Sequence, residues 1–294
     1  MIEAKGFKMR TDVQLDEYKA MLLPFAYNIT GDFMAAEDIV QEILTNFLLN
    51  PNDNIASPKH YLIRSVINRS INEKKLLRNR MEDYRGRWLP SPVLTADAIY
   101  RGADRDKVLH YSLLVLLERL TAKERAVFIL KETFDFEHEE IADILNIKKD
   151  HSRQLLKRAK EKVGPAVDRS PEPSAGNEEL LKQLIEAISN SDVTRTKLLL
   201  SADVQCVSDG GTKTKAARNM LTGQDRVSKF LKAIYRKYYP AGATSQLVQI
   251  NFHPAILFKM DGRIFRCIIF EIEKRIIQKV FIIVNPDKLQ KLQF

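Results

Sequence analysis

Apolar residues recur at helical spacing between residues 137 and 159 and predict two helices joined by a tight turn. Asn146 stands at the turn, where its tolerance of left-handed backbone geometry is useful. Ala142 is small enough to let the second helix cross closely. The apolar face of the first helix continues on the second: Ile141, Ile144, Leu145, Leu155, Leu156 and Ala159. The pattern is typical of a helix-turn-helix, with an ordinary helical hairpin as the alternative.

Several helical stretches precede this pair. Residues 12–50 predict two helices, with Asp32 as the cap of the second. Pro58 is predicted to open a long helix that runs to about Arg85. A strongly apolar helix is expected over Lys107–Leu120, and the sequence TAKE that begins at Thr121 predicts a capping box for the helix after it. This part of the chain is therefore expected to be all-α.

The pattern changes after the Pro-, Gly- and Ser-rich residues 164–177, which we interpret as a linker. Asp261–Gly262 lies between two apolar runs and predicts a two-residue hairpin turn. Helices are predicted over 178–200 and 223–239, and strands over 245–251, 255–260, 263–272 and 275–284. We expect an α+β domain with helices on one face of a curved antiparallel sheet.

Composition narrows the class of protein. The 294 residues are 45% hydrophobic and 29% charged, as in a soluble globular chain of two or three domains. No apolar run is long enough to span a bilayer, and the N-terminus has no apolar signal segment, so we expect a cytoplasmic protein without a membrane partner. Cys206 and Cys267 lie in apolar, strand-like contexts and are expected to be buried thiols, with no disulfide or metal site.

The net charge of +9 is unevenly distributed. Between Lys19 and Lys59 there is no Lys or Arg but there are five acids, whereas Lys59–Arg87 holds nine basic residues against three acids. A second basic block, Lys148–Lys162, holds seven basic residues against two acids. Two basic blocks suggest two contacts with DNA, and the acidic stretch suggests a basic protein partner.

The second helix of the 137–159 pair carries the side chains that a DNA-reading helix needs. Arg153 and Gln154 are candidates for base edges, because Arg can pair with guanine and Gln with adenine. Phosphate contacts are expected from Lys149, Lys157 and Arg158, and His151 is a further candidate for DNA contact. The alternative for this face is a solvated basic surface, and for Arg158 a further alternative is that it packs back against the first helix.

The order of acidic helix, basic helix, linker and basic helix-turn-helix resembles the extracytoplasmic-function (ECF) sigma factors of the sigma-70 family. This resemblance implies that AEDIVQE (36–42) binds the clamp of core RNA polymerase, through Glu37, Asp38, Gln41 and Glu42. It implies that residues 61–80 melt and read the minus-ten promoter element, through Arg64, Asn68, Arg69, Lys74, Lys75, Arg78 and Arg80. Residues 140–160 would read the minus-thirty-five element. The alternative for the acidic residues is a solvated helix face.

Three short motifs resemble the subgroup that carries a fused SnoaL-like domain. They are WLPSP (88–92), DGGTK (209–213) and an intact NPDKL (285–289); Ser91 and Thr212 depart from the subgroup's usual Glu and Gly. The lone tryptophan, Trp88, is expected to anchor its segment onto a neighbouring domain. The resemblance implies interdomain or regulatory contacts for Trp88, Pro90, Asp209, Lys213, Asn285, Pro286, Asp287 and Lys288.

The expected architecture is multi-domain, with two all-α sigma domains and an α+β SnoaL-like cone. We expect sigma region 2 over 1–87, a linker over 88–104, the helix-turn-helix region 4 over 105–165, a linker over 166–177 and the SnoaL-like regulatory domain over 178–294. No enzymatic activity, cofactor or metal is expected, since His253 stands with few candidate acids on the apolar strands. Whether the cone binds a small ligand stays open. The alternative function is a polymerase-independent DNA-binding regulator with a ligand-sensing cone.

Overall fold

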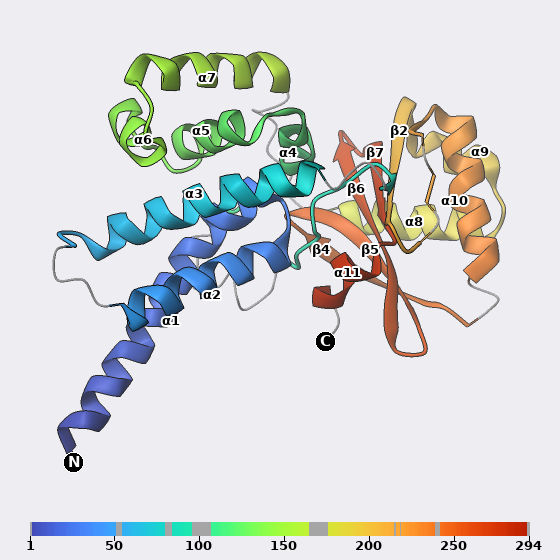
Figure 1. Cartoon of the computed structure of the whole chain (residues 1–294). Coiled ribbons are helices and arrows are strands. Elements are labelled where there is room, and N and C mark those ends of the chain that lie inside the picture. Colours follow the sequence, from blue (N-terminus) through green and yellow to red (C-terminus); the bar gives the residue numbers. More distant parts are fainter. Residues whose placement is uncertain are drawn as a thin grey trace. The chain divides into compact units, whose positions relative to one another are not determined.

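The computed structural model describes residues 2–50, 55–79, 84–95, 107–164, 176–214, 216–217, 219–238 and 242–292. The chain forms two compact units (Figure 1). The helical unit comprises Met1–Asn79, Ala96–Leu109 and Leu113–Asp168. The sheet unit comprises Arg80–Thr95, His110–Ser112 and Arg169–Phe294. None of the helices in these described ranges is both long and apolar enough to cross a membrane.

Three helices form the first half of the helical unit: α1 (Ile2–Thr30), α2 (Phe33–Leu49) and α3 (Pro58–Asn79). The predicted cap is confirmed, because the Asp32 side chain accepts a hydrogen bond from the Ala35 amide at 3.2 Å. The apolar stripe of α2 packs inward through Ile39 and Val40. The helix expected to reach about Arg85 ends earlier, at Asn79, because Arg85 and Gly86 form a strand instead.

The second half of this unit contains the helix-turn-helix. Its elements are α4 (Tyr111–Leu116), a 3-10 turn (Leu117–Arg119), α5 (Ala122–Glu132), α6 (His138–Leu145) and α7 (Lys149–Val163). The capping box of Thr121 and Glu124 is present as predicted. Asn146 adopts the expected left-handed conformation, with φ 50°, and the Ile147 amide bonds back to the Ala142 carbonyl at 2.9 Å. The tight turn therefore forms as the sequence predicts.

The helix expected over Lys107–Leu120 is shorter than predicted. Regular α-helix begins only at Tyr111 and ends at Leu116. The buried Asn28 side chain explains the late start: its amide donates to the Lys107 carbonyl at 2.8 Å, and its oxygen accepts from the Leu109 amide at 3.4 Å. A side chain that hydrogen-bonds nearby backbone groups offers them an alternative to helix formation.

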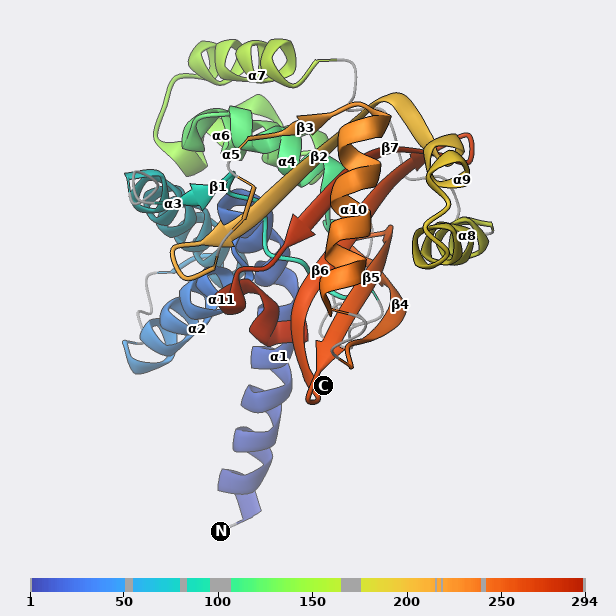
Figure 2. The same ribbon diagram turned by 90° about the vertical axis from the view of Figure 1, so that its right-hand side faces the viewer.

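The sheet unit is built on a curved sheet of seven strands (Figure 2). The order is β1-β2-β7-β6-β5-β4, and β3 pairs with β2 outside this path. The strands are β1 (Arg85–Gly86), β2 (Leu200–Gly211), β3 (Leu221–Thr222), β4 (Thr244–Ile250), β5 (His253–Met260), β6 (Arg263–Glu273) and β7 (Ile276–Ile283). A wholly antiparallel sheet was expected, and this prediction is wrong: the sheet is mixed, because β2 runs parallel to β7.

Helices cover one face of this sheet and bury the core between them. They are α8 (Asn177–Ser189), α9 (Val193–Leu198) and α10 (Gln224–Tyr238), and a short α11 (Pro286–Leu289) follows β7. Leu184 of α8, Leu231 of α10 and Phe270 of β6 belong to the same buried cluster. The single helix expected over 178–200 is wrong: Ser191 takes a left-handed φ of 59°, and β2 begins at Leu200.

Two smaller predictions for this unit are confirmed. Asp261 and Gly262 both have positive φ, at 49° and 75°, which is the geometry of the predicted two-residue hairpin turn. Cys206 and Cys267 are buried free thiols, as expected. Burial raises the pKa of Cys206 to about 12, so its thiol stays protonated and unreactive near neutral pH.

Candidate functional site

The outward face of α7 presents most of the predicted DNA-reading side chains to solvent. His151, Arg153, Gln154, Lys157 and Arg158 are all exposed, so Arg158 does not pack back as the alternative interpretation required. Ser152 is buried instead, and its hydroxyl lies 2.9 Å from Nδ1 of His138 on α6. This contact helps to fix the angle between the two helices, so the exposed side chains project from a rigid element.

Two cations of α7 are held by acidic neighbours. Lys149 pairs with Glu139, and Arg153 pairs with Asp150 at 3.2 Å. Both pairs are solvent-exposed, and exposed ion pairs contribute only about 0–1 kcal/mol. A phosphate or a base edge could therefore replace either acid at little cost.

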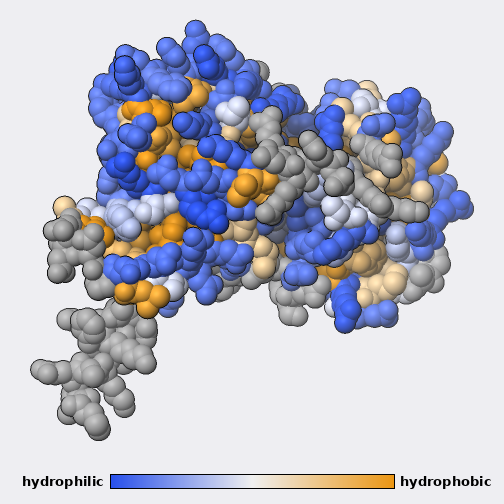
Figure 3. Space-filling view, viewed as in Figure 1, coloured by the Kyte–Doolittle hydropathy of each residue, from blue (hydrophilic) through white to orange (hydrophobic). Residues whose placement is uncertain are grey.

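The acidic positions of α2 form an open surface. Asp38, Gln41 and Glu42 are exposed and Glu37 is half-buried. Large apolar side chains are exposed along the same helix: Met34 at 37%, Leu48 at 45% and Leu49 at 72%. Hydrophobic surface interrupts the hydrophilic surface around α2 and α3 (Figure 3). A mixed acidic and apolar helix face fits a protein partner better than a solvated face.

Several predicted DNA contacts on α3 are turned onto α6 within the helical unit. Arg64 lies 3.2 Å from the Asp143 carboxylate, and the Asn68 amide donates to the Ile144 carbonyl at 2.9 Å. Arg69 pairs with Glu42 and, more closely, with Glu73. Lys75 is exposed, whereas the side chain of Arg78 and all of Arg80 lie outside the described residues. In this conformation Arg64 and Asn68 face the helix-turn-helix.

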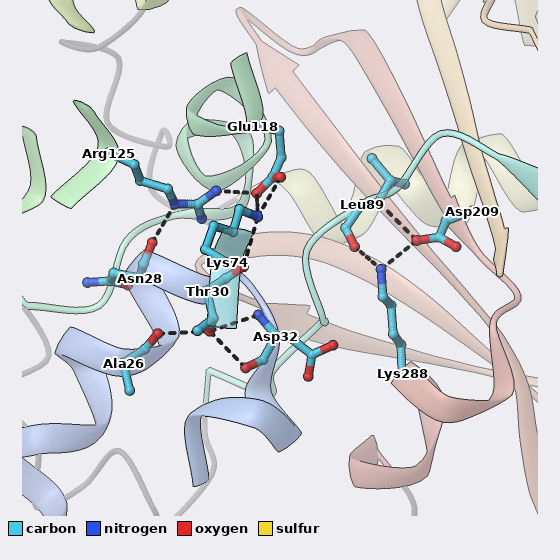
Figure 4. A network of polar contacts seen from close by, with 10 residues as sticks. All are labelled: Ala26, Asn28, Thr30, Asp32, Lys74, Leu89, Glu118, Arg125, Asp209 and Lys288. Atoms are coloured by element: carbon cyan, nitrogen blue, oxygen red, sulfur yellow. Dashed lines mark hydrogen bonds and ion pairs between the residues drawn. The ribbon is translucent and has the colours of Figure 1, made fainter. Parts of the chain in front are cut away.

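Lys74, also expected to contact DNA, is buried in a network of charges (Figure 4). Its ammonium lies 2.7 Å from Glu118 and donates to the Thr30 carbonyl at 2.9 Å. Arg125 is fully buried, pairs with the same carboxylate, and donates to the Asn28 carbonyl at 2.7 Å. We name Lys74, Glu118 and Arg125 the helical charge network.

The helical charge network joins three segments that are distant in sequence. Burial by itself would raise the pKa of Glu118, but Arg125 and Lys74 hold that pKa below its usual value. The carbonyls of Asn28 and Thr30 lie in the last turn of α1, where a helix lacks its own donors and attracts cations. The sequence prediction missed Glu118 and Arg125. The available signal was Arg125, which directly precedes the apolar run AVFIL.

In the sheet unit, the three short motifs meet around one buried carboxylate (Figure 4). Asp209 is fully buried and accepts hydrogen bonds from the Tyr84 hydroxyl at 2.6 Å and the Leu89 amide at 2.9 Å. It also accepts from the Gly211 amide at 3.0 Å and forms an ion pair with Lys288 at 2.7 Å. A carboxylate with this many donors is fully satisfied as an anion.

Lys288 completes this arrangement from the NPDKL motif. Its ammonium lies 3.9 Å from the centre of the Trp88 ring, a cation–π distance, and donates to the Leu89 carbonyl. Asp209, Lys288, Trp88 and Tyr84 are named the strap clasp from here on. Trp88 and Pro90 thus lie against the sheet unit, as the lone tryptophan suggested, and the Tyr111 hydroxyl donates to the Pro90 carbonyl at 2.8 Å.

The remaining motif residues support the strap clasp. Asn285 caps α11, with Pro286 as the first helical residue, and its amide donates to the Tyr84 hydroxyl at 3.1 Å. A Cβ on Gly211 would lie 2.8 Å from the Asn285 side chain, so the second glycine of DGGTK permits this approach. Lys213 and Asp287 form an exposed ion pair at 2.7 Å.

The segment 84–95 runs as a strap between both edges of the sheet. Its start is strand β1, which pairs with β2 at one edge. Its end bridges Leu94 to Ile250 of β4 at the other edge, where the Val93 amide also donates to the Asn251 side chain at 3.0 Å. We name residues 84–95 the strap. The expected linker is thus an integral part of the sheet unit over its described residues.

The chain was compared with known proteins. Residues 15–80 match the model of sigma-70 region 2, and residues 110–163 match that of sigma-70 region 4. The ECF RNA polymerase sigma factor SigJ of Mycobacterium tuberculosis H37Rv is 30% identical over 253 residues, which cover 81% of this chain and 79% of SigJ. The probable ECF RNA polymerase sigma factor SigI of that species is 28% identical over 286 residues, covering 94% and 93% of the two chains.

A solved structure agrees over nearly the whole length. The crystal structure of the extracytoplasmic function sigma factor SigJ from M. tuberculosis matches with a TM-score of 0.74 and 26% identity, covering 95% of this chain and 98% of that one. The matched regions contain the acidic face of α2, the basic helix α3 and the helix-turn-helix. On the strength of these likenesses, the chain belongs to the ECF sigma factors of the sigma-70 family.

Proposed function

We propose that this sigma factor directs core RNA polymerase to promoters with two DNA elements at a fixed separation, and that the sheet unit controls this activity in cis. The family membership supports the role in transcription initiation. The single observation that carries the assignment is that one chain has both an acidic face on α2 and an exposed basic face on α7.

The α2 face is the proposed docking surface for polymerase. Asp38, Gln41 and Glu42 supply exposed polar groups, and the apolar side chains beside them supply area that can be buried. Charge complementarity to a basic partner mainly speeds and orients association, whereas burial of Leu48 and Leu49 would contribute affinity.

The α7 face is the proposed reader of the upstream promoter element. Arg153 and Gln154 lie on the exposed side near the N-terminal end of the helix, the end that contacts base edges in helix-turn-helix proteins. Lys157 and Arg158 follow one turn later and would hold phosphates.

The α3 helix is the proposed reader of the downstream element. Arg64, Asn68 and Arg69 would hold the melted strand, while Lys75 supplies an exposed cation. Arg64 and Asn68 are bonded to α6 in this conformation, so binding the downstream element through them requires these two side chains to leave Asp143 and Ile144.

Control in cis rests on how the chain between α3 and α5 is held. The sheet unit holds the strap, and it also holds residues 110–112, where the Tyr111 amide donates to the Asn251 carbonyl at 3.1 Å. The chain that follows α3 and the start of α4 therefore both belong to the sheet unit and connect it to the DNA-reading elements. Because a promoter sets the separation of its two elements, a unit that holds these connections can govern promoter recognition.

Binding to core RNA polymerase tests the proposed docking surface. An Asp38→Arg/Glu42→Arg variant of the full chain should lose binding, because it reverses the charge of the exposed face. Glu178→Arg/Glu179→Arg, a double reversal on exposed acids of α8, is the matched control and should bind as the unmodified chain does. Equal binding by both variants would reject α2 as the docking surface.

Deleting residues 285–294 tests control in cis. The deletion removes Lys288 together with the rest of α11 and its cap, and should change transcription from a cognate promoter while the helical unit still binds polymerase. Transcription equal to that of the full chain, at equal occupancy of polymerase, would rule out this role.

A further inference from the structure

A cavity in the sheet unit contains a buried cation that no described acid neutralises. It has a volume of about 260 Å³ and lies between α10 and the sheet. Its walls include Ser208 of β2, Ile234, Lys237 and Tyr238 of α10, Arg266 of β6 and Ile282 of β7. Most of this lining is apolar, and the residues that line it include no aspartate or glutamate among those described.

Arg266 is 7% exposed, and its Nε and NH1 groups have no hydrogen-bond partner among the described residues. Its guanidinium carbon lies 4.5 Å from the centre of the Tyr238 ring and 5.6 Å from that of Phe265. Burial lowers the pKa of Arg266 from its usual value, while the Tyr238 hydroxyl opposes that shift. The aromatic rings hold the cation in place but leave hydrogen-bond donors free.

A second polar group without a partner lies in the same cavity. Ser208 is 3% exposed, and its hydroxyl has no hydrogen-bond partner among the described residues. Buried polar groups in native proteins are normally hydrogen-bonded, so two such groups in one cavity call for a ligand or ordered water. Both lie on walls that also carry apolar side chains.

The acidic residues of β6 do not neutralise the charge of Arg266. Side chains alternate across a strand, and Arg266, Ile268, Phe270 and Ile272 occupy the positions that face the buried cluster. Glu271 occupies the opposite set of positions and pairs there with Lys279 at 2.7 Å. Among the described residues, no carboxylate therefore compensates the charge of Arg266 on the face where the cavity lies.

We propose that this cavity binds a small organic monocarboxylate, with its carboxylate on Arg266 and Ser208 and its apolar body between α10 and the sheet. The volume lies just below the range of about 300–1,000 Å³ that is usual for small-molecule sites, so the ligand is small. Lys237 also lines the cavity but is exposed, so Arg266 is its one buried cation among the described residues. One buried cation and one hydroxyl match a single negative charge better than a phosphate dianion. The inference concerns binding alone and does not depend on the proposed control in cis.

Titration calorimetry on the full chain tests the proposal with benzoate and hexanoate as probes. Benzamide and hexanamide are the neutral controls of the same shape, and inorganic phosphate tests for a site that takes any anion. Both carboxylates should bind, and each amide should bind at least about 30-fold more weakly, because it leaves the buried cation unpaired. Equal affinity of acid and amide, stronger binding of phosphate, or no binding of either carboxylate at 10 millimolar (about the weakest useful affinity) would overturn the proposal.

Variants locate the binding site. Arg266→Met should weaken carboxylate binding by about 30-fold or more and leave amide binding little changed. Arg263→Met, an exposed position on the same strand, is the matched control and should change neither. Ser208→Val removes the hydroxyl, narrows the cavity and suits a strand, so it tests the site if the Arg266 variant does not fold. Carboxylate binding that survives both Arg266→Met and Ser208→Val would contradict the assignment.

Discussion

Each of the two units buries a lysine against a carboxylate, but the two arrangements differ in the number of cations that the carboxylate has. In the helical charge network, Glu118 has two cations, and each cation also bonds a carbonyl of α1. In the strap clasp, Lys288 is the cation paired with Asp209, and both are 5% exposed or less. When one cation is lost, the first arrangement keeps a cation beside its carboxylate, and the second does not.

The two arrangements also join different kinds of structural element. The helical charge network joins α1, α3, the 3-10 turn before α5 and α5 itself, all of which are helical elements within one unit. The strap clasp joins a chain segment to a sheet, through four hydrogen-bonded or stacked groups. The strap also buries apolar side chains, because Leu89, Val93 and Leu94 are each 9% exposed or less, so its polar anchors act together with apolar packing.

The largest expected effect is that of Lys288→Met. It leaves Asp209 buried without its cation, which should lower the free energy of unfolding of the sheet unit by about 3–5 kcal/mol. Urea denaturation measures it, with Lys213→Met as the control, because the Lys213–Asp287 pair is exposed and contributes about 1 kcal/mol or less. The double variant Asp209→Asn/Lys288→Met should recover part of the loss. A Lys288→Met effect as small as the control's would contradict the difference drawn between the units.

Lys74→Met should have a smaller effect. Arg125 still neutralises Glu118, so the expected loss in the free energy of unfolding is about 1–3 kcal/mol, from the Thr30 carbonyl and one carboxylate oxygen left without a donor. The neighbouring exposed lysine gives the control, Lys75→Met, which should be close to neutral. If Lys74→Met lowers the free energy of unfolding as much as Lys288→Met does, Arg125 does not compensate for the loss of Lys74, and the difference between the two units is contradicted.

Mild acid should distinguish the units. Burial lowers the pKa of His253 to about 4, and that of His110, whose ring centre lies 5.7 Å away, also to about 4. Nε2 of His253 accepts a hydrogen bond from the Ser112 amide at 3.4 Å, which protonation would abolish. Since the unfolded imidazole titrates near its usual value of about 6.5, its contribution is complete above that pH and declines as pH falls towards 4.

The expected loss between pH 7 and pH 5 is about 1–2 kcal/mol for His253, which is 4% exposed, and less for the partly exposed His110. Glu118 has a lowered pKa, so its contribution is retained over this range and is lost only as pH falls through that lowered value. Hydrogen-exchange protection, corrected for the intrinsic exchange rate at each pH, should therefore fall more for β5 and β6 amides than for α1 and α3 amides. His253→Asn should abolish most of the difference. A sheet unit whose corrected protection does not change with pH in this range would refute the explanation.

Much of the fold could be predicted from the sequence because its signals are local. The four C-terminal strands, the Asp261–Gly262 turn and the left-handed Asn146 follow from residue type and period. Strand β2 was missed because its main partner, β7, is about 75 residues away and parallel, and because Leu198–Leu200 continue an apolar run after a helix. Long-range pairing leaves no periodic signal in one strand.

The site was predicted unevenly for a related reason. The motif residues Trp88, Asp209 and Lys288 could be grouped by resemblance, and they do meet, but nothing in the sequence predicted the part that Tyr84 plays. Lys74 has the residue type of a phosphate contact, yet its burial depends on Glu118 and on the end of α1. A charged residue's partners are set by tertiary structure, which a charge pattern does not specify.

The measurement that tests the central claim most directly is transcription in vitro from a cognate promoter by core polymerase loaded with the double variant Asp209→Asn/Lys288→Met. That variant removes the buried charges of the strap clasp and leaves α2 and α7 untouched. The account predicts that polymerase binds this variant as tightly as the unmodified chain, while the amount of transcript changes severalfold. Equal transcript from both chains at equal polymerase occupancy would contradict control by the sheet unit.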